Sequence, residues 1–140
     1  MRRLAFIVLP LLLAGCVADR CRTPFGPGGD FDLSIPAYAP LAGTGAMVIQ
    51  TDLYGYEVGH RGIFVRRSGF VDFVAFDCVC PNDHDIALQP DPGNDFLLRC
   101  PVCGSSFETV QGNPLEGSAT GCPLYQYHTS LEGQRLFIWP

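Results

Sequence analysis

The chain has 140 residues, with nine basic residues, all of them arginine, and fourteen acidic ones, so its formal net charge is −5 at pH 7. This length holds one domain with a sizeable hydrophobic core and is too short for two. The acidic balance excludes nucleic acid and anionic surfaces as partners bound through charge.

Residues 1–15 have the pattern of an export signal. Two arginines precede an apolar stretch, residues 4–13, which is too short to remain in a bilayer as a spanning helix. Leu-Ala-Gly-Cys at residues 13–16 resembles the lipobox of bacterial lipoproteins, which are cleaved before the cysteine and diacylated on it. The resemblance implies a membrane anchor through lipid on Cys16, in the bacterial cell envelope, on the periplasmic side or in the outer membrane. An ordinary secretory signal with an unmodified Cys16 is the alternative.

Residues 16–30 have no periodic apolar pattern and predict a flexible tether. From residue 31 onward, short runs rich in Val, Ile and Phe alternate with turn residues, which is typical of strands. No window after the signal has a helical repeat of adequate length, and sixteen glycines and twelve prolines would interrupt one. The sequence therefore predicts an all-β domain over residues 31–140, with strands at residues 31–35, 46–51, 62–66, 70–76, 96–98, 107–110 and 135–139.

Four cysteines form two close pairs, each after a strand-like run and before turn residues. The first pair is Cys78 and Cys80 in Cys-Val-Cys-Pro, and the second is Cys100 and Cys103 in Cys-Pro-Val-Cys-Gly. Thiolates are soft, negative ligands that are costly to bury without a cation, so two loops that bring four of them together predict a metal centre. Four cysteines suit one tetrahedral zinc ion or an iron–sulfur cluster.

The order of these loops resembles that of Rieske-type domains, in which one loop carries C-x-H and a second carries C-x-x-H-G. Further matches follow the second pair at residues 104–107 (Gly-Ser-Ser-Phe), 111–115 and 123–127 (Pro-Leu-Tyr-Gln-Tyr). The similarity covers residues 31–140 and is greatest to the small Rieske-like lipoproteins of bacterial envelopes. It implies an antiparallel β-sandwich in which the two cysteine loops form a small metal-binding subdomain. It also implies a [2Fe–2S] cluster and single-electron transfer to a redox or envelope partner protein.

Both positions of the iron-ligating histidines are cysteine in this chain, at Cys80 and Cys103. The resemblance therefore implies a cluster with Cys78 and Cys100 on one iron and Cys80 and Cys103 on the other. Because imidazole ligands raise the Rieske potential, four thiolates predict a low, ferredoxin-like potential. Two alternatives stay open: one zinc ion on all four cysteines, or no metal and disulfides such as Cys78–Cys100 or Cys80–Cys103. Export argues against the cluster, because clusters are assembled in the cytosol and an exported chain meets oxidising conditions.

The remaining cysteines and the polar residues near the first pair have simpler interpretations. With Cys16 lipidated and four cysteines in the two close pairs, Cys21 and Cys122 are the two cysteines that remain, and they can form a disulfide. Such a disulfide would stabilise the fold by about 4 kcal/mol because it closes a long loop. Two unpaired thiols are the alternative. His84 could replace a cysteine as a ligand, but its acidic surroundings favour an exposed loop histidine. The nearby acids fit no calcium loop and are interpreted as a solvated face; they are Asp83, Asp85, Asp91 and Asp95.

No arrangement typical of a catalytic site accompanies the cysteines in the sequence, which lacks a Gly-rich nucleotide loop and a supported nucleophile–base pair. We therefore expect a protein that is not an enzyme. The first expectation is a single-electron carrier for an envelope partner. The alternative is a non-redox structural or interaction module in which zinc or disulfides close the cysteine loops.

Overall fold

The computed structural model describes residues 21–140, so the predicted signal and the lipidation site Cys16 lie outside the described residues. The described part contains short strands, one 3₁₀ turn η1 (Pro36–Tyr38) and one single-turn helix α1 (Ala39–Ala42). Its strands are β1 (Gly29–Asp32), β2 (Ala46–Ile49), β3 (Ile63–Arg67), β4 (Phe73–Asp77), β5 (Gln89–Asp91), β6 (Asn94–Arg99), β7 (Ser106–Glu108), β8 (His128–Glu132) and β9 (Arg135–Trp139). The predicted all-β class is confirmed. Within residues 21–140, no helix has the length and apolar character needed to cross a membrane.

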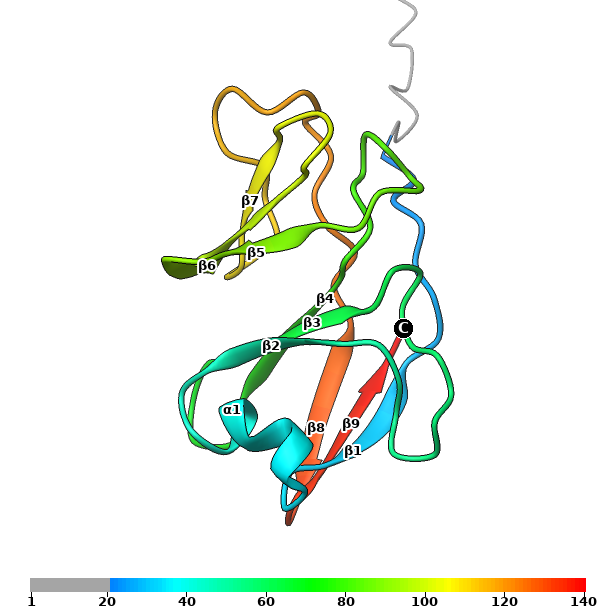
Figure 1. The fold of residues 1–140 in the computed structure, drawn as a ribbon, viewed down its shortest axis with the longest axis vertical. Coiled ribbons are helices and arrows are strands. Elements are labelled where there is room, and N and C mark those ends of the chain that lie inside the picture. The colour runs from blue at the N-terminus through cyan, green and yellow to red at the C-terminus, as the bar shows by residue number, and fades with distance from the viewer. Residues whose placement is uncertain (1–20) are drawn as a thin grey trace, which may run out of the picture.

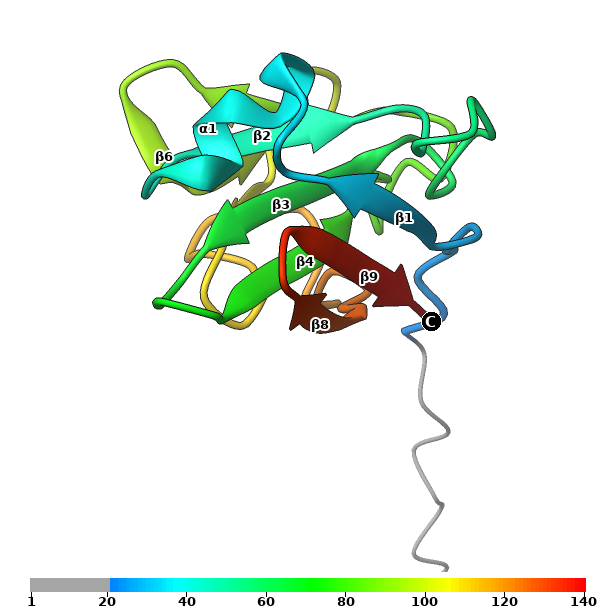
Figure 2. The same cartoon turned by 90° about the horizontal axis from the view of Figure 1, so that it is seen from below.

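The strands form three antiparallel sheets of three strands each, in the orders β1-β9-β8, β2-β3-β4 and β5-β6-β7. The first sheet joins the two ends of the described chain, because β1 pairs with β9. The β5-β6-β7 sheet is a separate unit inserted between β4 and β8, and it projects to the upper left in Figure 1. The β1-β9-β8 and β2-β3-β4 sheets cross below it, with α1 beside β2 (Figures 1 and 2).

The central sheet β2-β3-β4 is covered on both faces. This explains why β3 begins with three consecutive apolar residues. Side chains alternate across a strand, so Ile63 and Val65 enter one core while Phe64 enters the other. The first core lies between the central sheet and β1-β9-β8, where Phe31 and Leu136 are fully buried. This arrangement confirms the expected antiparallel sandwich.

The second core lies between the central sheet and the inserted sheet. Phe64 and Phe76 from the central sheet meet Leu98 of β6 and Phe107 of β7 there. Three of the four paired cysteines, Cys78, Cys80 and Cys100, are buried in this apolar cluster, and Cys103 packs against it. The inserted sheet therefore holds the second cysteine loop against the first.

The described part of the expected tether lies on the folded body. Gly26 donates its backbone N–H to Asp77 at 3.0 Å, and Phe25 stacks on Tyr125 with ring centroids 4.0 Å apart. Thr23 donates its hydroxyl to the Pro123 carbonyl at 2.8 Å. Residues 21–28 have no regular secondary structure, but these contacts fix them, and the folded body begins before residue 31.

The elements that differ from expectation are short or polar. Pro36 and Pro40 lie in the first turns of η1 and α1, where a missing N–H and a fixed φ are tolerated, and each element lasts only about one turn. Strand β5 is Gln-Pro-Asp and β8 is His-Thr-Ser-Leu-Glu, so neither carries the apolar alternation by which strands are recognised.

Candidate metal centre

Two loops form the candidate centre. The first follows β4 and carries Cys78 and Cys80; its backbone is closed by hydrogen bonds from Cys80 N–H to the Ile86 carbonyl at 2.9 Å and from Ile86 N–H to the Asp83 carbonyl at 2.8 Å. The second joins β6 to β7 and is closed by Cys100 N–H donating to the Ser105 carbonyl at 2.8 Å. Backbone hydrogen bonds thus fix both loops independently of any ligand.

The loops bring four potential ligand atoms into one compact group. The sulfurs of Cys80, Cys100 and Cys103 and a carboxylate oxygen of Asp83 all lie within 4.8 Å of one another. The Cys80 and Cys103 sulfurs are 3.7 Å apart. Asp83 Oδ2 lies 3.6 Å from the Cys100 sulfur and 4.0 Å from the Cys80 sulfur. Three thiols and one carboxyl group from two loops can therefore act on one ion.

Cys78, the fourth cysteine expected at the centre, is not part of this group. Its side chain is fully buried in the second core, in the same cluster as Phe64 and Leu88. Its backbone is held on both sides, because its N–H donates to the Gly62 carbonyl at 2.9 Å and its carbonyl accepts from Leu88 N–H at 2.6 Å. The compact group thus contains three of the four predicted cysteines together with Asp83, and the four-cysteine set stays a prediction.

The pKa values of the thiols differ because their surroundings differ. Burial, with a smaller contribution from Asp77, raises the pKa of Cys78 far above its usual range. Burial also raises the pKa of Cys80, to about 12. At Cys103 burial acts in the same direction, but hydrogen bonds from the hydroxyl and backbone of Ser105 outweigh it and lower the pKa. A thiol buried like that of Cys80 becomes a thiolate at neutral pH only beside a cation.

The second loop has the shape of a metal knuckle. Gly104 adopts a φ of +73°, a conformation that side chains disfavour, and donates its N–H to the Cys100 carbonyl at 3.0 Å. Ser105 is fully buried; its hydroxyl lies 3.1 Å from the Cys103 sulfur and accepts the Ala119 N–H at 2.9 Å. The glycine turns the chain so that Cys103 faces back towards Cys80.

Asp83 was interpreted from the sequence as part of a solvated acidic face, and that interpretation was wrong. Asp83 is half-buried and faces the cysteine sulfurs, whereas its neighbour Asp85 is exposed and pairs with Arg61 at 3.4 Å. A signal for this position does exist in the sequence. Cys-Pro-Asn-Asp at residues 80–83 matches the spacing of Cys-Pro-Val-Cys at residues 100–103.

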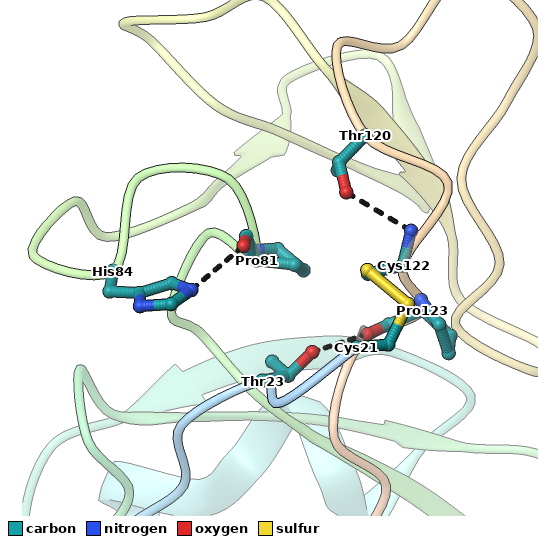
Figure 3. Close-up of a disulfide and its surroundings, with 7 residues drawn as sticks. All are labelled: Cys21, Thr23, Pro81, His84, Thr120, Cys122 and Pro123. Carbon is teal, nitrogen blue, oxygen red and sulfur yellow. Dashed lines mark hydrogen bonds between the residues drawn. A yellow bond between two sulfur atoms is a disulfide. The ribbon is translucent and has the colours of Figure 1, made fainter. Parts of the chain in front are cut away.

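His84 and the disulfide lie next to the first loop. His84 turns its Nε2 to the Pro81 carbonyl at 2.9 Å and is outside the ligand group (Figure 3). Cys21 and Cys122 are joined in a disulfide, the pairing expected from the sequence (Figure 3). Cys78, Cys80, Cys100 and Cys103 are all free thiols, and the 3.7 Å between the Cys80 and Cys103 sulfurs is well beyond an S–S bond.

Comparison with known proteins gives structural neighbours only. No family model and no curated protein matches the chain. Among solved structures, the chain is similar to the Sphingomonas yanoikuyae B1 ferredoxin, with 18% identity over 56% of this chain and 74% of that one, at a TM-score of 0.45. It is also similar to a chain from the complex of reduced oxygenase and oxidized ferredoxin in carbazole 1,9a-dioxygenase, with 19% identity, 66% and 86% coverage and a TM-score of 0.45. The ferredoxin of carbazole 1,9a-dioxygenase from Nocardioides aromaticivorans IC177 has 16% identity, 68% and 84% coverage and a TM-score of 0.43. These values are too low to transfer a cofactor or a partner to this chain.

Proposed function

We propose that this protein is a metal-binding β domain in which thiolates from two loops hold one tetrahedral ion, with Zn²⁺ as the ion that fits. The observation that carries the proposal is the compact group of three sulfurs and one carboxylate oxygen. For a zinc–sulfur bond of about 2.3 Å, two ligands of a tetrahedron lie about 3.8 Å apart. The Cys80 and Cys103 sulfurs are separated by 3.7 Å.

The same compactness argues against a binuclear cluster. Two irons and their bridging sulfides must lie between two pairs of cysteine ligands, so a [2Fe–2S] centre needs a longer ligand cage than a single ion. It would also need a fourth thiolate, and the Cys78 sulfur lies outside the compact group, on a residue whose backbone is hydrogen-bonded on both sides. A single ion needs no movement of Cys78.

Zinc suits both the ligands and the proposed compartment. It accepts thiolate and carboxylate ligands together and binds more tightly than iron(II) to the same site. A chain exported unfolded can take it up after export. With four protein ligands the site is closed, so zinc would act as a structural ion that holds the inserted sheet on the central sheet. The domain would then serve as a non-redox interaction module.

A single-electron carrier with a [2Fe–2S] cluster is the second candidate. It is favoured by the order of the two loops and by the Gly-Ser-Ser-Phe sequence after the second one, both of which resemble Rieske-type domains. In this candidate all four cysteines are ligands, and Cys78 is required.

Metal analysis and a visible spectrum of the protein purified without chelator separate these candidates, with Cys100→Ser and Cys78→Ser as matched variants. We expect a colourless protein with about one zinc ion per chain, loss of zinc in Cys100→Ser and retention in Cys78→Ser. A coloured protein with about two irons per chain, bleached by Cys78→Ser, would establish the cluster instead. A protein without metal would refute both candidates.

We also propose that the domain is anchored in the bacterial envelope by lipid on Cys16. The lipobox-like sequence at residues 13–16 supports this, and so does the Cys21–Cys122 disulfide, since disulfides persist in oxidising compartments. Labelling with a fatty-acid analogue should mark the wild-type chain in the membrane fraction and leave Cys16→Ser unlabelled. Equal labelling of the two chains would contradict the anchor.

A further inference from the structure

We propose that Asp83 is the fourth ligand, so that the centre is a Cys₃Asp site for a single ion rather than a four-cysteine site. The inference rests on the proposed metal-binding function and specifies its ligand set. It is carried by three observations: the internal match between the two loops, the backbone geometry around Cys80 and the position of the Asp83 carboxylate.

The two loops repeat one pattern. Residues 80–83 read Cys-Pro-Asn-Asp and residues 100–103 read Cys-Pro-Val-Cys, so each loop has cysteine first, proline second and a possible ligand fourth. Cys80 corresponds to Cys100, and Asp83 corresponds to Cys103. In this register Cys78 precedes the motif and has no counterpart.

The backbone of the first loop also has the form of a ligand-bearing turn. The Cys80 N–H donates to the Ile86 carbonyl at 2.9 Å, which closes the loop around residues 80–86. Within this loop the Asp83 carbonyl accepts the Ile86 N–H at 2.8 Å. The loop therefore aims Cys80 and the fourth-position side chain at the same point, as the second loop does with Cys100 and Cys103.

The distances suit a carboxylate ligand. With zinc–sulfur and zinc–oxygen bonds of about 2.3 and 2.1 Å, a tetrahedral site places oxygen about 3.6 Å from each sulfur. Asp83 Oδ2 lies 3.6 Å from the Cys100 sulfur and 4.0 Å from the Cys80 sulfur.

The test is metal affinity in Asp83→Asn, with Asp85→Asn as the matched control. Both variants remove one negative charge from the same loop, but the Asp85 side chain is 91% exposed and lies outside the ligand group. We expect Asp83→Asn to weaken zinc binding by a factor of about ten or more, measured by competition with a chelating dye, and Asp85→Asn to leave the affinity unchanged. Equal affinities in the two variants, with wild-type protein still binding zinc, would overturn the assignment of Asp83 alone.

A gain-of-ligand variant keeps the proposal testable if Asp83→Asn folds poorly. Asp83→Cys should complete a four-thiolate site and bind zinc more tightly than the wild type. In the cobalt(II)-loaded proteins, the sulfur-to-metal charge-transfer band should be about one-third stronger in Asp83→Cys, because four thiolates replace three. An unchanged band would show that residue 83 does not reach the ion. If the wild type binds neither zinc nor cobalt, the proposed function fails as well.

Discussion

The carboxylate of Asp77 joins four segments of the chain, and replacing it with asparagine tests how the first cysteine loop is held. Asp77 is fully buried at the end of β4. Its Oδ2 accepts the Gly26 and His60 N–H groups at 3.0 and 2.6 Å and the Tyr127 hydroxyl at 2.7 Å. Its Oδ1 accepts the Val79 N–H, between the first two cysteines, at 3.1 Å.

Asparagine has nearly the same shape but only one oxygen. In its least costly orientation the amide NH₂ replaces Oδ1, which leaves the buried N–H of Val79 without an acceptor and brings it against another donor. A buried donor without a partner costs about 1–3 kcal/mol, and the bonds that remain lose the extra strength of an ionised acceptor. We expect Asp77→Asn to lower the free energy of unfolding by about 2–4 kcal/mol.

The assay is equilibrium unfolding in urea, followed by tryptophan fluorescence and circular dichroism. The midpoint should fall while the slope of the free energy with urea stays constant, because the folded state remains equally compact. Asp95→Asn is the control; its exposed side chain should change stability by less than about 0.5 kcal/mol. An effect of Asp77→Asn no larger than that of the control would refute this account of the loop's support.

Three further variants test other parts of the fold. Replacing both Cys21 and Cys122 with alanine should cost about 4–5 kcal/mol in urea unfolding, since the disulfide links residues 101 positions apart; an unchanged midpoint would contradict this. Gly112→Ala should cost about 2–4 kcal/mol, because φ is +79° and the added Cβ would lie 2.7 Å from the Phe76 ring; Gly117→Ala, with φ +85° and open space, should cost about half of that. Burial opposes ionisation of Glu108, but three backbone N–H groups outweigh it and lower its pKa. Its contribution to stability should therefore be present above the ordinary glutamate value and fade as the pH falls through the lower folded value. Glu108→Gln should lose that part of the pH dependence, and parallel pH–stability curves for the two proteins would argue against it.

The strands that build the two large sheets could be predicted because their apolar residues are regular. Strand β3 and strand β9 carry buried side chains at strand spacing, and both were expected within one or two residues of their observed bounds. Strand β5 was missed because it is exposed and contains Pro90, and its pairing with β6 comes from the hairpin rather than from its own side chains.

At the candidate site, cysteine spacing predicted part of the ligand group and missed the rest. Spacing alone predicted that two loops bring thiols together, and Cys80, Cys100 and Cys103 do meet. Spacing could not show that Cys78 continues β4 into the apolar core, where Phe64 and Leu88 hold it, because that depends on packing between distant segments. Asp83 was assigned to the surface by its acidic neighbours, although the Cys-Pro-x-x match between the loops marks its position.

X-ray absorption at the zinc and iron edges of the purified wild-type protein tests the central claim most directly, because it reports both the ion and its ligands. We expect about one zinc ion per chain with three sulfur neighbours at about 2.3 Å and one oxygen neighbour at about 2.0–2.2 Å. Iron with a second iron in its near shell, or zinc surrounded by four sulfurs, would contradict the single-ion Cys₃Asp centre.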